Sequence, residues 1–311
     1  MALHPVVQKI LESAQATGRP ALSAGTPDQA RAQVAAMRTP LGPGPKEVNM
    51  MNLWVPTRSG KIPARLYKPE KSPKGLVVYL HGGGWVCGQL DDFDALSRKL
   101  AKESGCAILL VDYRLAPEHT FPSALHDVED AIVWAHGKGM EYFEHKLPLI
   151  VAGDSAGANL GIAAIQALNK KISIALQVWF YPVTDSDMNR PSYQRYSKGM
   201  PLTCEDMRWF FSHYAPSEIW SDARISILNS STLKDSPSTW VATAEYDVLR
   251  DEGEAYANQL KVLGVNIELH RANGLTHGFA RLFNIVDTAC ELVEKAAAAM
   301  SNACETKTSG N

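Results

Sequence analysis

The stretch GDSAG at residues 153–157 decides the fold, because a strand pattern precedes it and a helix pattern follows it. Residues 147–152 are a short apolar run, and residues 158–168 are small and apolar residues that favour a helix. A serine between two such glycines marks a sharp strand-to-helix turn, in which the serine backbone is strained and the glycines allow close approach. We therefore expect the Ser155 hydroxyl to stand exposed above a sheet.

A serine hydroxyl is a weak nucleophile near neutral pH, so the turn at Ser155 predicts partner groups elsewhere in the chain. The chemistry needs a histidine that accepts the hydroxyl proton and an acid that orients this histidine. It also needs N–H donors for the negative charge that develops on a carbonyl oxygen. Each of these partners can be sought in the sequence.

The expected donors lie in a glycine-rich segment, HGGGW at residues 81–85, which follows the strand pattern at 76–80. Consecutive glycines let backbone N–H groups approach a ligand closely. The segment lacks the Lys-Ser or Lys-Thr of a phosphate-binding loop and the G-x-G-x-x-G spacing of a dinucleotide loop. The N–H groups of Gly83 and Gly84, joined by that of Ala156, are therefore the predicted oxyanion hole.

The orienting acid is expected in a turn that follows a strand, downstream of the serine. Residues 240–244 form such a strand pattern, and Glu245 and Asp247 come directly after it. Asp247 lies further into the turn and is the preferred acid, with Glu245 as its rival. Asp251 is interpreted as the opening residue of the next helix, where a negative charge complements the helix dipole.

The histidine base is expected after the last strand pattern. His277 follows residues 265–269 in a loop with glycines on both sides, which would let the loop carry the ring over the sheet edge. His270 falls in a strand pattern, and His126 and His136 fit a helical face, so these three are weaker candidates. The sequence therefore predicts His277 as the base.

The chain order Ser155, Asp247, His277 is the order found in α/β hydrolases. With these motifs, the sequence resembles the bacterial hormone-sensitive-lipase-like esterases (family IV) of the α/β-hydrolase fold. The resemblance covers about residues 76–279 and rests on HGGGW at 81–85, DYRLAPEH at 112–119, GDSAG at 153–157, DVLRDEG at 247–253 and HGF at 277–279. It implies hydrolysis of short- to medium-chain carboxylic esters, without metal or cofactor, under a mobile N-terminal helical cap.

Other activities of the same fold stay open beside carboxylester hydrolysis. These are a true lipase, an amide hydrolase, a deacetylase and a non-catalytic ligand receptor. One position departs from the family pattern, because Val248 stands where a proline is common, which predicts a less rigid turn around the acid. The resemblance also marks His81 as a scaffold for the glycine loop, and Arg114 and Glu118 as part of a salt-bridged loop under the pocket.

Apolar and aromatic side chains near the motifs predict the walls of a pocket for an apolar ester of modest size. The candidates are Trp85, Met200, Leu202, Phe210, Tyr214 and Phe279. For the aromatic residues of the helix pattern at 205–214, a place in the core is the competing interpretation.

Strand and helix patterns alternate along the chain, which predicts an α/β fold with a mostly parallel sheet of about eight strands flanked by helices. Strands are expected at residues 52–54, 62–67, 76–80, 107–111, 147–152, 174–180, 240–244 and 265–269, the first two as an antiparallel pair. Helices are expected at residues 5–16, 27–37, 92–104, 122–136, 158–170, 205–214, 251–263 and 286–300.

The expected domain organisation is an N-terminal helical cap segment at residues 1–50 and a catalytic domain at 51–300. A cap insertion is expected at about 186–236, and a flexible tail at 301–311. The first two helices are expected either to roof the pocket or to pack against the sheet.

Composition limits the partners. The 31 basic and 33 acidic residues give a net charge of -2, which provides no electrostatic footprint for nucleic acid or an anionic membrane. The five cysteines have no C-x-x-C spacing, so neither a disulfide framework nor a zinc site is expected. The N-terminus lacks a signal-peptide pattern and the chain lacks a long apolar run. We expect a cytoplasmic protein with an ester and water as substrates, no integral membrane association and a possible homodimer.

Overall fold

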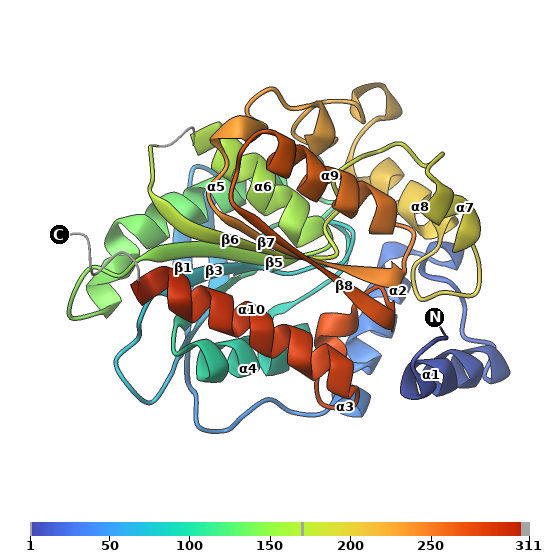
Figure 1. The fold of residues 1–311 in the computed structure, drawn as a ribbon, viewed down its shortest axis with the longest axis horizontal. Coiled ribbons are helices and arrows are strands. Elements are labelled where there is room, and N and C mark those ends of the chain that lie inside the picture. Colours follow the sequence, from blue (N-terminus) through green and yellow to red (C-terminus); the bar gives the residue numbers. More distant parts are fainter. Residues whose placement is uncertain (1, 169–170, 306–311) are drawn as a thin grey trace.

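A twisted sheet runs through the centre of the computed structural model, which describes residues 2–168 and 171–305 (Figure 1). Within these residues the sheet has 8 strands in the order β1-β2-β4-β3-β5-β6-β7-β8. The strands are β1 Asn49–Thr57, β2 Gly60–Lys68, β3 Leu76–Leu80, β4 Ala107–Val111, β5 Leu149–Asp154, β6 Ile174–Phe180, β7 Thr239–Tyr246 and β8 Ile267–Thr276. Strands β3 to β8 pair in parallel, and β2 pairs antiparallel with both β1 and β4. The predicted fold class is confirmed.

Helices cover both faces of this sheet (Figure 1). Helices α4 and α10 pack together on one face, and α5 and α6 pack together on the other, beside α9. The helices are α1 Pro5–Ala16, α2 Pro27–Ala36, α3 Arg38–Leu41, α4 Asp94–Ser104, α5 Ser123–His136, α6 Ala156–Leu168, α7 Pro191–Arg195, α8 Cys204–Tyr214, α9 Arg250–Val262 and α10 Asp287–Glu305. Every residue of β3, β4 and β5 is buried, which explains why these strands read as continuous apolar runs.

Two element boundaries differ from the sequence prediction in ways that matter for the site. Strand β8 continues to Thr276 instead of ending near residue 269, so His277 directly follows a strand. Helix α6 begins at Ala156, immediately after the serine, and the end predicted for it at residues 169–170 lies outside the described residues. Both changes tie the motif residues more firmly to the sheet than free loops would.

The structure also differs from the prediction of a flexible tail at residues 301–311. Helix α10 continues through Glu305, because Cys304 is buried at 2% exposure and its Sγ lies 3.8 Å from that of Cys106. Burial of this apolar side chain keeps the last turn on the sheet. Residues 306–311, the rest of the predicted tail, lie outside the described residues.

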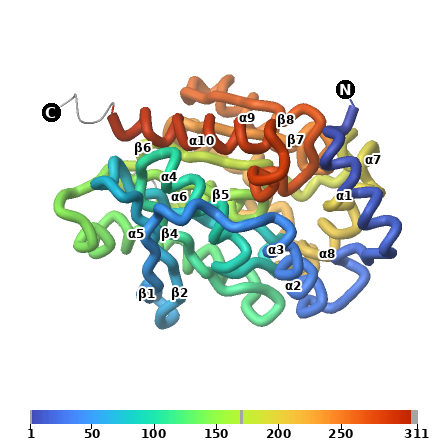
Figure 2. The backbone as a smooth tube through the Cα atoms, turned by 90° about the horizontal axis from the view of Figure 1, so that it is seen from below, coloured from blue at the N-terminus to red at the C-terminus, as the bar shows by residue number. Residues whose placement is uncertain are grey.

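The N-terminal segment reaches across to elements that come much later in the chain. The His4 N–H donates to the Gly274 carbonyl at the end of β8, at 2.9 Å. The Ser23 N–H donates to the Asp206 carboxylate of α8, at 2.8 Å. Figure 2 shows α1, α2, α3 and α8 gathered at one end of the molecule.

Candidate active site

The turn between β5 and α6 places Ser155 as its sequence pattern predicts. Ser155 has φ 53°, a left-handed conformation that is strained for a residue with a side chain. A Cβ on Gly153 would lie 2.7 Å from the Leu80 carbonyl oxygen, and one on Gly157 would overlap that same oxygen. Both glycines are therefore required by the close approach of β3 to this turn.

Ser155, His277 and Asp247 form a continuous hydrogen-bonded chain. The Ser155 Oγ lies 3.0 Å from the His277 Nε2, and the His277 Nδ1 lies 2.7 Å from an Asp247 Oδ2. The carboxylate is an acceptor only, so the ring carries its proton on Nδ1 and offers the Nε2 lone pair to the serine hydroxyl. The ring also packs against Tyr181, with centroids 4.6 Å apart.

The Ser155 hydroxyl is less exposed to solvent than the sequence predicts. Ser155 is only 5% exposed, and it faces a small cavity instead of standing free above the sheet. The reason is that Leu22 and Val34 of the N-terminal segment, and Phe210 of α8, also line this cavity. Side chains from two distant parts of the sequence therefore enclose Ser155.

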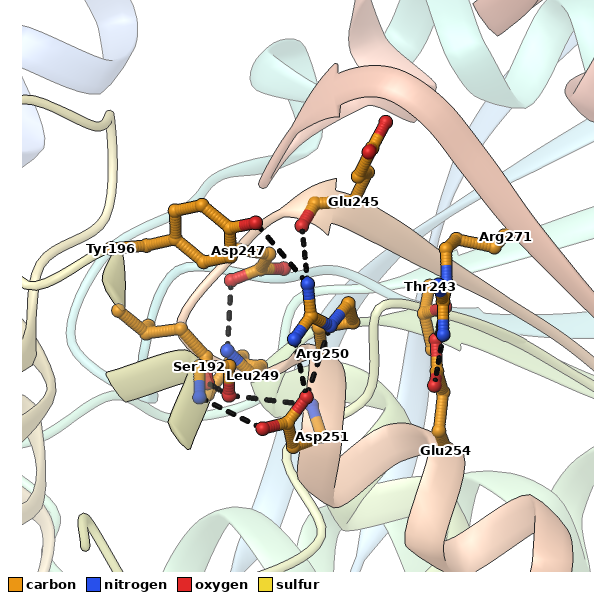
Figure 3. A network of polar contacts seen from close by, with 11 residues as sticks. Ser192, Tyr196, Thr243, Glu245, Asp247, Leu249, Arg250, Asp251, Glu254 and Arg271 are labelled. Carbon is orange, nitrogen blue, oxygen red and sulfur yellow. Dashed lines mark hydrogen bonds and ion pairs between the residues drawn. The ribbon is translucent and has the colours of Figure 1, made fainter. Parts of the chain in front are cut away.

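The turn that carries Asp247 is held by hydrogen bonds (Figure 3). The Leu249 N–H donates to the Asp247 Oδ1 at 3.0 Å, and the Ser192 hydroxyl donates to the Val248 carbonyl at 2.6 Å. The Ser192 N–H in turn donates to the Asp251 carboxylate at 2.8 Å. Through Ser192, helix α7 thus holds the turn at Val248, the position where the family pattern has a proline.

The rival acid, Glu245, points away from Asp247 (Figure 3). Its carboxylate accepts a hydrogen bond from the Gly274 N–H at 2.7 Å, and its carbonyl accepts one from Arg250 at 3.2 Å. Glu245 therefore connects β7 to β8 and lies outside the hydrogen-bonded chain of the histidine.

The glycine loop after β3 adopts a conformation that leaves two N–H groups free. Gly83 has φ 122° and Gly84 has φ 60°, both unfavourable for other residues. Within the described residues neither N–H has an acceptor, whereas the Gly82 N–H donates to Asp154 at 2.9 Å. Ala156 is the first residue of α6, so its N–H has no partner within the helix.

Two buried groups hold this loop in place. Asp154 accepts hydrogen bonds from Gly82 and from the Tyr79 hydroxyl, at 2.9 and 3.0 Å, and burial raises its pKa to about 6. The His81 ring stacks between Phe93 and Tyr113, and burial lowers its pKa to about 4. A neutral, stacked His81 matches the scaffold role predicted for it.

The loop motif at residues 112–119 makes two ion pairs. Arg114 pairs with Asp127 of α5 at 2.8 Å. Glu118 pairs with Arg31 of α2 at 2.6 Å, and the guanidinium lowers the pKa of this carboxyl to about 2. The second pair fastens the N-terminal segment to the loop below the cavity.

The cavity beside Ser155 measures about 120 Å³. Of the predicted wall residues, Leu202 and Phe210 line it. Trp85 and Tyr214 do not, because their rings stack on each other with centroids 4.3 Å apart. Phe279 packs against Tyr181 and Phe180 in the core, and Met200 is also absent from the lining.

Sequence reasoning missed several residues that line the cavity, namely Leu22, Val34, Phe93, Pro201, Met207 and Arg281. Met207 lies three residues before Phe210 on α8, so helical spacing alone would have placed both on one face. Leu22 and Val34 had no such signal, because only the folded chain brings them to the serine.

No group of three or more His, Cys, Asp or Glu residues within residues 2–168 and 171–305 is placed to hold a metal ion. Of the helices in these same ranges, none has both the length and the apolar character needed to cross a membrane.

Known proteins resemble the chain in sequence. It is 37% identical to the carboxylic ester hydrolase LipN of Mycobacterium tuberculosis over 297 residues, which cover 91% of this chain and 78% of that protein. It is 38% identical to an ethyl acetate hydrolase of Pseudomonas putida over 250 residues, covering 77% and 78%.

Solved structures resemble the chain in fold. An esterase of Pseudomonas putida matches with a TM-score of 0.93 and 28% identity, covering 97% of this chain and 98% of that one. A hyperthermophilic esterase of Pyrobaculum calidifontis matches with a TM-score of 0.90 and 34% identity, covering 97% and 99%. The family model described as alpha/beta hydrolase fold matches residues 77–281. The chain therefore belongs to the α/β-hydrolase family, in its hormone-sensitive-lipase-like group.

Proposed function

We propose that this chain is a serine carboxylesterase that hydrolyses short- to medium-chain carboxylic esters through an acyl-enzyme on Ser155. The observation that carries the proposal is the hydrogen-bonded chain from Ser155 through His277 to Asp247. The relatives named as a carboxylic ester hydrolase and an ethyl acetate hydrolase support the same reaction class. Residues 1–50 and 186–236 act in this proposal as a cap on the catalytic domain, residues 51–300.

Acylation begins when the Ser155 Oγ attacks the ester carbonyl carbon while the His277 Nε2 takes its proton. Asp247 keeps the ring in the reactive tautomer and stabilises the imidazolium that forms. The carbonyl oxygen becomes negative and accepts hydrogen bonds from the N–H groups of Gly83, Gly84 and Ala156. His277 then protonates the leaving alcohol, and the acyl group stays on the serine.

Deacylation repeats these steps with water in place of the serine. His277 takes a proton from water, and the resulting hydroxide attacks the acyl carbon in front of the same N–H groups. Collapse of this second intermediate returns the proton to the Ser155 Oγ and releases the carboxylic acid. Metal and cofactor have no part in this proposed mechanism.

The size of the cavity supports short acyl chains. Pockets for drug-sized ligands hold roughly 300–1,000 Å³, and the cavity beside Ser155 measures about 120 Å³. Its apolar lining, which includes Leu202, Met207 and Phe210, favours an apolar acyl group.

The test is the variant Ser155→Ala, assayed with p-nitrophenyl acetate and butyrate. We expect the rate constant kcat to fall by about four orders of magnitude or more, with unchanged circular dichroism. Activity like that of the wild type would remove Ser155 from the nucleophile role.

Two further measurements separate the alternatives within the fold. A kinetic panel of p-nitrophenyl esters from acetate to palmitate, together with matched anilides, distinguishes a carboxylesterase from a lipase and an amide hydrolase. Labelling by a fluorophosphonate tests the receptor alternative, because an unreactive Ser155 in the folded protein would favour a receptor.

We also propose a cytoplasmic location and a homodimer. The strand β8 lies at the edge of the sheet and exposes Leu269, which gives a second copy a strand to pair with. Gel filtration with light scattering tests the dimer, and cell fractionation tests the location.

A further inference from the structure

Arg281 shares the cavity with the catalytic residues. It belongs to the short 3-10 helix η7, Phe279–Leu282, which directly follows the His277 loop. Its side chain lines the same cavity as Ser155 and His277. The chain therefore places a permanent positive charge in the lining of the cavity that also contains Ser155 and His277.

Two guanidinium nitrogens of Arg281 lack an acceptor among the residues that the structure describes. Its Nε and one Nη are buried, and neither has a hydrogen-bond partner in the described part of the chain. Burying an unpaired charged group is costly, so such a group is normally paired or hydrogen-bonded.

The other half-buried arginines of the chain show how such a side chain is normally paired in this protein. Seven further arginines are half-buried like Arg281, and each pairs with a carboxylate of the protein; they are Arg31, Arg38, Arg65, Arg98, Arg114, Arg190 and Arg250. Among the half-buried arginines that the structure describes, Arg281 alone lacks such a partner. A general shortage of carboxylates does not explain the missing partner of Arg281, since the seven other half-buried arginines all have one.

The nearby carboxylates are engaged elsewhere. Asp154 lines the cavity but accepts its hydrogen bonds from Tyr79 and Gly82. Asp92 pairs with Arg38 at 2.6 Å. The charge of Arg281 favours the ionised form of Asp154, but the structure gives no hydrogen bond between these two side chains. The Arg281 guanidinium lies over the Phe93 ring, whose centroid is 5.0 Å from the guanidinium carbon. This contact supports the flat face of the guanidinium and uses none of its N–H groups.

We propose that Arg281 binds a carboxylate on the substrate, so that the preferred esters carry a free carboxylate besides the ester bond. This inference rests on the proposed esterase function and names the substrate class for the same site. The planar guanidinium offers paired N–H donors that match the two oxygens of a carboxylate. Because no hydrogen bond among the described residues holds the Arg281 guanidinium, this group can rotate above the Phe93 ring toward the cavity without breaking a hydrogen bond.

Two kinds of ester meet this description. The carboxylate is on the acyl side in a half-ester of a dicarboxylic acid, and on the alcohol side in an acylated hydroxy acid. Two pairs of probes distinguish them. The p-nitrophenyl hemiester of succinic acid is compared with p-nitrophenyl butyrate, and acetoxyacetate is compared with ethyl acetate.

The kinetic test compares the ratio of kcat/KM for the charged ester to that for the neutral ester. In Arg281→Met we expect this ratio to fall about tenfold to a hundredfold in one pair of probes, as for a lost charge-assisted hydrogen bond. Arg281→Lys keeps the charge but not the fork, so its ratio should fall less. The matched control Arg195→Met removes an exposed arginine of α7 and should keep the wild-type ratio. Ratios in Arg281→Met within twofold of wild type in both pairs would overturn the proposal.

A binding test separates this inference from the proposed reaction. Calorimetry measures the binding of two ligands, monomethyl succinate and acetoxyacetate, to Ser155→Ala and to the double variant Ser155→Ala/Arg281→Met. Both ligands should bind more tightly to Ser155→Ala than to the double variant. Equal affinities for both ligands in the two proteins would contradict the role of Arg281. If the wild type hydrolyses no ester while this affinity difference persists, the proposed function fails and the carboxylate site stands.

Discussion

At the scale of single residues, the two carboxylates after β7 show how position in a turn decides a role. Asp247 is 1% exposed and meets the His277 ring, whereas Glu245 accepts from the backbone of β8. The sequence could rank these two acids only by their distance from the strand. The folded turn separates them by their hydrogen-bond partners.

Asp247→Asn and Glu245→Gln form a matched pair for this difference. Asparagine in place of Asp247 can donate to the histidine and so favours the wrong tautomer; kcat should fall by roughly three to four orders of magnitude. Glu245→Gln keeps an acceptor for the Gly274 N–H and should lower kcat by less than about tenfold. Steady-state kinetics with p-nitrophenyl butyrate measures both, and a larger loss in Glu245→Gln would reverse the assignment.

Asp154 gives a prediction for stability against pH. Burial raises its pKa from 3.8 to about 6, so the folded state binds this proton more tightly than the unfolded chain does. Between these values the free energy of unfolding therefore falls as pH rises, by about 3 kcal/mol in total. Asp154→Asn does not titrate, so its stability relative to wild type should rise by about this amount from pH 4 to pH 7. Urea unfolding at the two pH values measures it, and a constant difference would refute the prediction.

The hydrogen-bonded grouping of Ser155, His277 and Asp247 was predictable because each of these residues has a local signature in the sequence. Glycines around Ser155 and a loop after β3 reflect constraints that act between neighbours in the chain. Trp85 and Tyr214 were assigned wrongly to the pocket, because a large aromatic side chain has the same sequence signature in a core as in a wall. Leu22 and Val34 were missed because their place depends on contacts far along the chain.

At the scale of elements, helix α8 serves the cavity and the core from one buried face. Its residues 207, 210, 211 and 214 are spaced three or four apart, so they share that face. Met207 and Phe210 line the cavity, while Phe211 and Tyr214 pack against Trp85. A change at Met207 or Phe210 should alter substrate preference, and a change at Phe211 or Tyr214 should alter packing only.

Phe210→Ala tests the part of this face that lines the cavity. Removing the ring enlarges the cavity, so the ratio of kcat/KM for octanoate to that for acetate should rise about tenfold, since each methylene bound is worth about 1 kcal/mol or more. The control Tyr214→Phe removes a buried hydroxyl that has no hydrogen-bond partner among the described residues. The control should keep the wild-type ratio, and an equal rise in both variants would contradict the division of α8 into cavity residues and packing residues.

The junction of β3 with α6 gives a stability prediction. A Cβ on Gly157 would overlap the carbonyl oxygens of Leu80 and His81, which belong to the backbone and have little freedom to move. Gly157→Ala should therefore lower the free energy of unfolding by on the order of 3 kcal/mol. In the control Gly253→Ala, within α9, the Cβ would lie 3.1 Å from a methyl group of Thr243 and at ordinary contact distance, 3.6 and 3.7 Å, from the Pro182 ring. This change should stay within about 1 kcal/mol. Chemical unfolding measures both, and similar losses would refute the packing argument.

Element types were predictable along most of the sheet, because buried parallel strands are short apolar runs between helices. The ends of elements were less predictable. Strand β8 passes through Gly274 and its neighbours, which resemble a loop in sequence, because pairing with β7 continues to Thr276. Helix α10 likewise continues through Glu305, where the buried Cys304 side chain lies beside Cys106.

At the scale of the whole molecule, the cavity beside Ser155 is lined by residues from an early and a late part of the sequence. The N-terminal segment contributes Leu22 and Val34 to the cavity, and η7 contributes Arg281. Arg31 fastens α2 by its ion pair with Glu118 and by a 2.9 Å hydrogen bond to the Val86 carbonyl.

Arg31→Met should loosen this attachment. The variant loses the ion pair and the hydrogen bonds to backbone carbonyls, so we expect KM for p-nitrophenyl butyrate to rise several-fold while the sheet keeps its circular dichroism. The control Arg19→Met removes an exposed arginine at the other side of the segment and should leave KM unchanged. A normal KM in Arg31→Met would show that this ion pair does not hold the cavity closed.

The contacts of the N-terminal segment also order events during synthesis on the ribosome. Residues such as His4 and Ser23 emerge first, yet their partners Gly274 and Asp206 emerge much later. The N-terminal segment therefore stays unpacked while the strands of the sheet are synthesised. Closing such long loops is slow. A nascent chain that ends soon after Ser155 still lacks Asp247 and His277, the partners proposed for this serine, and the cavity residues of α8. Because His277 comes late in the sequence, the proposed hydrogen-bonded chain of Ser155, His277 and Asp247 can form only after most of the polypeptide has been made.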